Sequence, residues 1–338
     1  MAKKRKKIMW WHKKYKRRKK KRKNYKKDEA RYNLIQENEF FIFLKYLPLA
    51  ALFVCKNEDL WKGEGRPPCR LRDILICLSI QQYFGKSLRR SIGIIRFVTQ
   101  AANISVNIPC FKTLDNYLNN PLIKPYLTGI IEITSKPLSE IEKYFATDCT
   151  GETTSTASTW FCIRSGKTIK KKDHVTAHIT TGTMLNIVTA ITVNAYSGED
   201  NIIFRKHNQF TAKNFEVKEH SGDSAYLCRE NCDDVESVGG MPFFRPKSNT
   251  LVKSDGSYAW LRMMLNYYNH PIKAKRSYNR RLNVESTNHA KKAKFGSHVK
   301  SKNDTAKETE STIQWIDYNF SVLSRAYYEY DIEPYFVK

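Results

Sequence analysis

Residues 278–292, YNRRLNVESTNHAKK, place four polar side chains at a regular spacing: Tyr278, Arg281, Glu285 and Lys292. The last three lie three, seven and fourteen positions after the first. A helix turns by about 100° per residue, so all four fall on one side of a helix. We predict a helix over Asn283–Phe295, with one face that holds a single carboxylate among two cations and a phenol. Such a face can bind a metal ion and the phosphates around it.

Two aspartates upstream are candidates to join Glu285. Asp148 lies near the end of a β-prone run, and aspartate is disfavoured within strands, so its position needs a reason. Asp223 follows Gly222 at another predicted strand end. Each of these acids also has an ordinary explanation. Asp148 can be a turn residue, Asp223 can be the N-cap of the next helix, and Glu285 can be a solvated partner of Arg281.

Convergence of the three acids would create a site for phosphoryl transfer. Two divalent ions about 4 Å apart can activate the attacking oxygen and stabilise the leaving oxygen. Mg²⁺ prefers oxygen ligands and retains waters, so two or three carboxylates suffice to hold it. We therefore expect Asp148, Asp223 and Glu285 to meet in space.

The second half of the chain alternates between strand and helix patterns. Strands are predicted over Tyr144–Cys149, His174–Thr181, Asn186–Val193, Phe215–His220 and Met241–Arg245. Helices are predicted over residues 201–214, Ala225–Val238, Tyr258–Tyr268 and Asn283–Phe295. The first three strands suggest an antiparallel meander with Asp148 on its first strand.

The first half is basic and then helical. Residues 1–27 contain 17 Lys or Arg with interleaved aromatics, which predicts a disordered tail, over residues 1–30, that neutralises DNA phosphates or serves as a solubilising extension. Residues 31–140 predict a helical DNA-binding region, because apolar residues recur at helical spacing. Its order of helix, Gly turn, helix, polar turn and helix is compatible with a helix-turn-helix variant or with any small helical bundle. Helices are predicted here over Phe40–Val54, Leu71–Phe84, Leu88–Val98 and Leu114–Leu118.

The formal net charge of +26 favours a polyanionic partner, and nucleic acid is preferred over a membrane surface. The apolar run Phe40–Cys55 contains Lys45 and Pro48 and is shorter than a membrane span, so we predict a buried helix there and no membrane partner. The eight cysteines are scattered, a pattern typical of reduced thiols. We expect a cytoplasmic, nucleoid-associated protein.

The spacing Tyr278-x2-Arg281-x3-Glu285-x6-Lys292 resembles the Y-R-E-K signature of the insertion-sequence-4 group of bacterial transposases. The aspartates lie in similar contexts, Asp148-Cys149-Thr150-Gly151 and Gly222-Asp223-Ser224-Ala225-Tyr226. Gly65-Arg66-Pro67-Pro68 and Ile108-Pro109 also resemble the N-terminal region of such proteins, so the likeness spans residues 65 to about 300.

This resemblance implies an α+β chain in which an RNase H-like catalytic domain, residues 141–338, has a mixed five-stranded sheet flanked by helices. It implies that Asp148, Asp223 and Glu285 hold two Mg²⁺ ions, with Mn²⁺ as a substitute. It also implies that Tyr278, Arg281 and Lys292 contact double-stranded DNA at transposon ends and target. The implied activity is nicking of the ends and their joining to target DNA, by a homodimer on DNA.

Other positions and other functions stay open. Only 61 residues separate Asp223 from Glu285, so there is no room for the large β-rich insertion of some relatives. Trp160 and Trp260 are candidates to stack on a flipped base, although core packing is the favoured role for both. His289, one turn beyond Glu285, is placed to reach the site, and the charge run with Glu308 and Glu310 is expected to be solvated. Alternatives are a structure-selective nuclease of the same fold and a non-catalytic DNA-binding protein.

Overall fold

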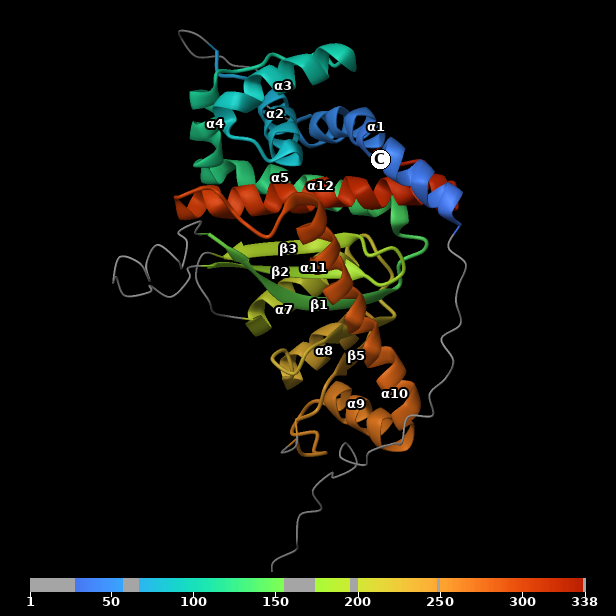
Figure 1. Cartoon of the computed structure of the whole chain (residues 1–338). Helices are drawn as coiled ribbons and strands as arrows, with labels where there is room; N and C mark the ends of the chain where they lie inside the picture. Colours follow the sequence, from blue (N-terminus) through green and yellow to red (C-terminus); the bar gives the residue numbers. More distant parts are fainter. Residues whose placement is uncertain (1–27, 57–66, 155–173, 195–199, 248–249, 337–338) are drawn as a thin grey trace, which may run out of the picture.

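The computed structural model describes residues 28–56, 67–154, 174–194, 200–247 and 250–336. At its centre is a five-stranded sheet in the order β3-β2-β1-β4-β5 (Figure 1). Its strands are β1 (Tyr144–Thr153), β2 (His174–Gly182), β3 (Val188–Asn194), β4 (Glu219–Gly222) and β5 (Met241–Phe244). The first three strands pair antiparallel, and β4 and β5 continue the sheet in parallel pairing from β1. The predicted α+β class, mixed sheet and antiparallel meander are confirmed.

Every regular element described before the sheet is a helix. These are α1 (Glu29–Val54), α2 (Leu71–Phe84), α3 (Leu88–Ala101), α4 (Phe111–Leu118) and α5 (Lys124–Ser135), with short 3-10 turns at Pro121–Ile123 and Lys136–Leu138. Phe43 and Leu47 are fully buried, which confirms that the Phe40–Cys55 run is a buried helix. Gly85 ends α2 in the left-handed region at φ 59°, a conformation that costs little for glycine.

The long helix α12 (Asp304–Tyr330) lies between the N-terminal helices and the sheet, and the sequence did not predict it (Figure 1). One side carries Ile313, Ile316 and Phe320 into the core that α1 and α2 build. The other side carries Trp315 and Tyr318 into a second core against the sheet. Because α12 contributes to both cores, the helices before the sheet and the sheet itself are joined through one element.

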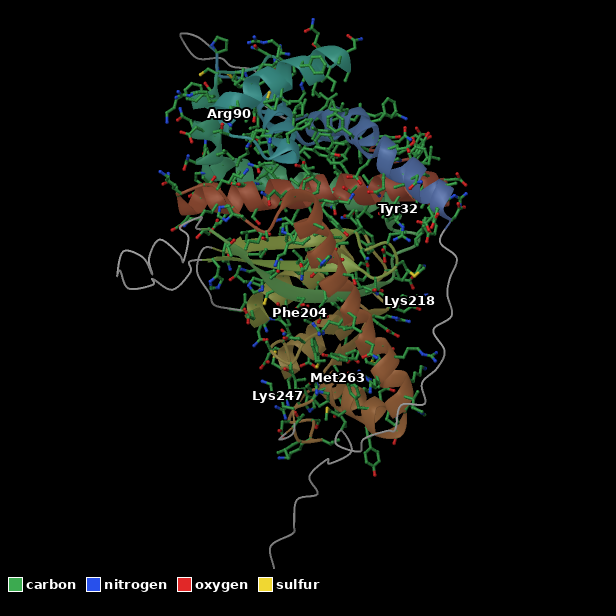
Figure 2. The ribbon with its side chains drawn as sticks, in the orientation of Figure 1. Tyr32, Arg90, Phe204, Lys218, Lys247 and Met263 are labelled. Atoms are coloured by element: carbon green, nitrogen blue, oxygen red, sulfur yellow. The ribbon has the colours of Figure 1, made fainter. Side chains whose placement is uncertain are left out.

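The remaining helices cover the two faces of the sheet or extend beyond its β5 edge. They are α7 (Asp200–Ala212), α8 (Arg229–Ser237), α9 (Tyr258–Asn269), α10 (Pro271–Tyr278) and α11 (Leu282–Phe295), with a 3-10 turn at Asn279–Arg281. Figure 1 shows α12 above the sheet and α7 below it, with α11 running down in front of the strands from α12 towards α10. Figure 2 labels Phe204 of α7 and Met263 of α9, which belong to one buried cluster.

Several predicted elements differ from the structure. The strand predicted over Phe215–His220 is β4 at Glu219–Gly222, and the helix predicted over Ala225–Val238 begins only at Arg229. The helix α10 was not predicted. Glu310, expected to be solvated, is 3% exposed and accepts hydrogen bonds from the backbone N–H groups of Lys300 and Ser301, so it holds the loop before α12.

In the described parts of the chain, no helix has both the length and the apolar character needed to cross a membrane.

Candidate active site

Asp148 is the fifth residue of β1 and pairs with Ile179 of the antiparallel strand β2. Its side chain is 14% exposed and lies on the face of the sheet that α11 covers. Burial, with smaller contributions from the charges of Asp223 and Glu285, raises the pKa of Asp148 to about 6 against the opposing effect of Arg281. An aspartate whose pKa is raised by burial towards neutral pH is a candidate for a functional residue.

Asp223 comes directly after β4. Strand β4 runs parallel to β1, and Gly222 pairs with Thr147. The residues that follow this pair are Asp223 and Asp148, so the two aspartates lie at the same end of the sheet. Gly222 is required here, since a Cβ at this position would lie 2.9 Å from the Phe244 ring. The alternative role of Asp223, as N-cap of the next helix, is excluded, because Cys228 is the N-cap of α8. The Asp223 carboxylate accepts from the backbone N–H of Ala225 at 2.6 Å in a local turn, and α8 begins six residues later.

Glu285 lies in the first turn of α11 and its side chain is 52% exposed. Arg281, one turn earlier, donates to Glu285 Oε1 at 2.6 Å and to Asp148 Oδ2 at 3.3 Å. The guanidinium therefore bridges two of the three predicted acids. Its Nε is buried and has no hydrogen-bond partner among the described residues. The structure contains the ion pair between Glu285 and Arg281 that was given above as the ordinary explanation for Glu285. Asp148 is also paired with Arg281.

Lys292 and Tyr278 occupy the two ends of the predicted stripe. Lys292 Nζ donates to Thr150 Oγ1 at 2.7 Å and to the Gly151 carbonyl at 3.0 Å, so it ties α11 to β1 beside Asp148. Tyr278 is half-buried, and its ring centroid lies 5.9 Å from the Arg281 guanidinium. The stripe is divided among the end of α10, the 3-10 turn and α11, rather than lying on one uninterrupted α-helix.

The contact between α11 and β1 also contains a buried ion pair that was not predicted from the sequence. Lys291 Nζ donates to Glu152 Oε1 and to Gln314 Oε1, each at 2.6 Å, and both members of the Lys291–Glu152 pair are 0% exposed. Asp148, Thr150 and Glu152 alternate along β1 and so share one face. This alternation was a signal available in the sequence, while the burial of Lys291 was not.

A fourth carboxylate lies nearby. Asp200, the first residue of α7, has Oδ1 3.7 Å from His178 Nε2, and its side chain is 44% exposed. Burial raises the pKa of the Cys149 thiol, and the charges of Asp148, Asp200 and Asp223 add to the rise. The proximity of Asp200 to the predicted acids had no signal in the sequence.

Of the remaining candidate residues from the sequence, Trp260 and His289 do not join the three acids. Trp260 is 6% exposed and donates from its indole N–H to the Leu251 carbonyl at 3.3 Å, which confirms the favoured core role. His289 is exposed, and among the described residues it makes no hydrogen bond to the three acids. Trp160 lies outside the described residues.

The donor set agrees with Mg²⁺ in chemistry, because three carboxylates from separate elements supply oxygen ligands. Their arrangement does not form a ready ligand set. Within the described ranges, no group of three or more His, Cys, Asp or Glu side chains is placed to hold a metal ion. Arg281 donates to one oxygen of Asp148 and to one oxygen of Glu285, so a metal ion would compete with this guanidinium for the two carboxylates.

Comparison of the chain with protein-family models, with curated proteins and with solved structures gives no match.

Proposed function

We propose that this protein is a DNA transposase whose catalytic domain is RNase H-like and which cleaves transposon ends and joins them to target DNA. The observation that carries the proposal is electrostatic. Asp148, Asp223 and Glu285, which are far apart in the sequence, are close enough in space for two of the carboxylates to raise the pKa of the third. The order of the elements that bear them, the first strand, the end of the fourth strand and a later helix, supports the same proposal.

Asp148, Asp223 and Glu285 would hold Mg²⁺, which supplies activation of the attacking oxygen and stabilisation of the leaving oxygen when bound. The chain's own residues orient these groups. Lys292 fixes α11 against β1 through Thr150 and Gly151. Arg281 pairs with both Asp148 and Glu285 in the free protein, and a DNA phosphate can take over this guanidinium when DNA binds.

The charge of the chain supports DNA as the partner. The excess of 26 positive charges and the 17 basic residues in the first 27 provide a large sequence-independent attraction for phosphate. Tyr278, at the other end of the site from Lys292, is half-buried and can present part of its ring to a DNA end.

The test is strand cleavage of a DNA that carries the sequence flanking the gene. With Mg²⁺, the wild-type protein should cut at inverted repeats in that sequence, and Glu285→Gln should bind the same DNA without cutting it. Glu308→Gln, a carboxylate of α12 away from the site, is the matched control and should cut like the wild type. Equal cutting by Glu285→Gln would refute the proposal, and cutting that ignores the repeats would favour a structure-selective nuclease.

The Arg281 bridge favours a second candidate, a non-catalytic DNA-binding protein. A guanidinium shared between Asp148 and Glu285 satisfies both carboxylates without a metal ion, as a structural ion pair does. In that case Asp148 and Glu285 stabilise the contact of α11 with β1 through Arg281, and none of the three acids takes part in a reaction. Divalent metal binding that depends on Asp148 separates the two candidates.

A further inference from the structure

A cavity of about 640 Å³ lies between the turn that joins α2 to α3, the end of α4, and the loop that joins α11 to α12. It is lined by residues from both halves of the chain, from Gln81–Arg90 on one side and from Lys300–Asn303 on the other. It is remote in sequence from Asp148 and Asp223, yet the loop on one side is the direct continuation of α11, which bears Glu285.

Four cations line this cavity: Lys86, Arg90, Lys300 and Lys302. Lys300 Nζ donates to the carbonyl of Gly85, which ties the loop to the α2–α3 turn. Lys86, Arg90 and Lys302 have no ion-pair or hydrogen-bond partner for their side chains among the residues that the structure describes. Arg90 is labelled in Figure 2. Three uncompensated cations around one concave surface attract a dianion or a phosphodiester.

The two acids at the cavity are already engaged. Asp115 accepts from Lys112 Nζ at 2.7 Å. Glu310 is 3% exposed and accepts from the backbone N–H of Lys300 at 3.0 Å and of Ser301 at 2.8 Å. Glu310 therefore acts as a brace that fixes the loop, and the excess of positive charge at the cavity remains.

The cavity has a defined shape because its walls are hydrogen-bonded to each other. Asn303 Nδ2 donates to Asn119 Oδ1 at 2.8 Å, which joins the loop to the end of α4. The N-terminus of the 14-residue helix α3 adds backbone N–H groups, and the Ser87 side chain makes no capping hydrogen bond there. The positive end of the helix dipole reinforces the field of the cations.

We propose that this cavity binds a backbone phosphate of the DNA duplex that extends along α11 from the site at Glu285. The inference rests on the proposed function and names a DNA contact that the three acids and the Tyr278–Lys292 stripe do not include. From Glu285 to Phe295, α11 spans about 15 Å, and one DNA strand has a phosphate about every 3.4 Å. The cavity thus contacts the DNA more than about four phosphates from the position of cleavage. DNA bound there would contact both the helices of residues 31–140 and the loop that follows α11, the helix that bears Glu285.

The experiment measures equilibrium binding of a duplex of about 30 base pairs against salt concentration, without divalent metal, so that cleavage plays no part. Each phosphate contact contributes about 0.9 to the slope of log K against log salt. Lys86→Ala with Lys302→Ala removes the contact with this one phosphate, so it should lower the slope by about 0.9 and weaken binding roughly fivefold near 0.15 M salt. Lys213→Ala with Lys218→Ala removes the same charge from exposed positions just after α7 and just before β4, and should leave the slope unchanged.

A second variant separates loss of binding from loss of folding. Ser87→Glu places a negative charge at the mouth of the cavity and at the N-cap of α3, where it interacts favourably with the helix dipole. It should raise the melting temperature of the free protein slightly and yet weaken duplex binding. Binding and slope equal to wild type in both variants would overturn the proposal, as would failure of the wild type to bind duplex DNA. A mononucleotide that stabilises the wild type but not the double variant, with duplex binding unchanged, would assign the cavity to a free phosphate ligand instead and also overturn it.

The result is independent of strand cleavage. If Glu285→Gln cuts DNA like the wild type while the cavity variants lose salt-dependent binding, the proposed catalytic function fails and the phosphate site stands. If the cavity variants bind normally while Glu285→Gln is inactive, the phosphate site fails and the catalytic function stands.

Discussion

Asp148→Asn should make the metal-free protein more stable at neutral pH. Burial raises the pKa of Asp148 from its ordinary value of 3.8 to about 6 in the folded protein, so the folded state resists ionisation of this carboxyl. A pKa unit corresponds to about 1.4 kcal/mol, and the shift therefore corresponds to about 3 kcal/mol at pH 7.5. The side chain is only 14% exposed, so solvent screening reduces this value little. The neutral amide avoids this cost while keeping the shape of the side chain.

The sign of the pH dependence follows from the direction of the shift. A carboxyl whose folded-state pKa is raised contributes its full stability below its unfolded pKa and loses that contribution as pH rises through its folded pKa. The advantage of Asp148→Asn over wild type should thus be below about 1 kcal/mol at pH 4 and grow to about 3 kcal/mol at pH 7.5. Urea unfolding of both proteins with chelator present, at a series of pH values, measures it.

The same comparison tests whether the acids have been placed together for function. A residue that destabilises the fold at working pH and is nevertheless used has a function that needs its charge. Mg²⁺ should stabilise the wild type and leave Asp148→Asn unchanged. The reasoning is refuted if Asp148→Asn is less stable than the wild type at pH 7.5, or if the difference between them does not change with pH.

Other predictions concern groups that the fold buries. Lys291→Met should lower the free energy of unfolding in urea by about 3 to 5 kcal/mol, because it leaves Glu152 buried and unpaired. Adding Glu152→Leu should recover most of the lost stability. Additive effects of the two substitutions would contradict the pairing. Asp317 is fully buried, and neither of its oxygens has a partner among the described residues, so Asp317→Leu should raise the unfolding free energy at pH 7.5 by about 1 to 3 kcal/mol; a loss of stability would show that the carboxyl is satisfied in solution. Gly222→Ala should lower the melting temperature, with a cost of about 1 to 3 kcal/mol, because the added methyl group meets the Phe244 ring; an unchanged melting temperature would mean that the ring can move.

The first strands and most early helices could be predicted because they carry strong local patterns. Leu71–Phe84 has helical spacing and ends at Gly85, and the structure places α2 at the same residues. The β1–β3 meander follows β-branched runs, and Asp148 lies on its first strand as expected. In these segments local propensity and tertiary packing favour the same structure.

Helix α12, which was missed, and strand β4, whose bounds were misplaced, lack such patterns. The buried face of α12 includes Gln314, Asp317 and Asn319, which read as a polar run although all three are at most 3% exposed. Strand β4 has only four residues, Glu219–Gly222, and its burial rests on polar contacts such as His220 with Thr147. Tertiary contacts between distant segments determine these elements, and they leave no periodic signal along the chain.

Some features of the candidate site could likewise be predicted from the sequence, and others could not. The three acids were chosen from their positions at strand ends and on a helix face, and Asp148 responds to the charges of the other two. The bridge from Arg281 to Asp148 spans 133 residues, and the contact of Asp200 with His178 depends on how α7 lies across the sheet. Such contacts depend on the three-dimensional arrangement of elements whose relative positions the sequence pattern does not define.

The central claim is that Asp148, Asp223 and Glu285 together hold a divalent metal ion, and calorimetric titration of the metal-free protein with Mn²⁺ tests it most directly. Wild-type protein should bind Mn²⁺ with measurable heat, more weakly below pH 6 than at pH 7.5, because Asp148 becomes protonated. Asp148→Asn should lose this binding, whereas Asp233→Asn, an acid of α8 that accepts from Ser257, should retain it. Equal Mn²⁺ binding by wild type and Asp148→Asn, or no binding by the wild type, would contradict the account.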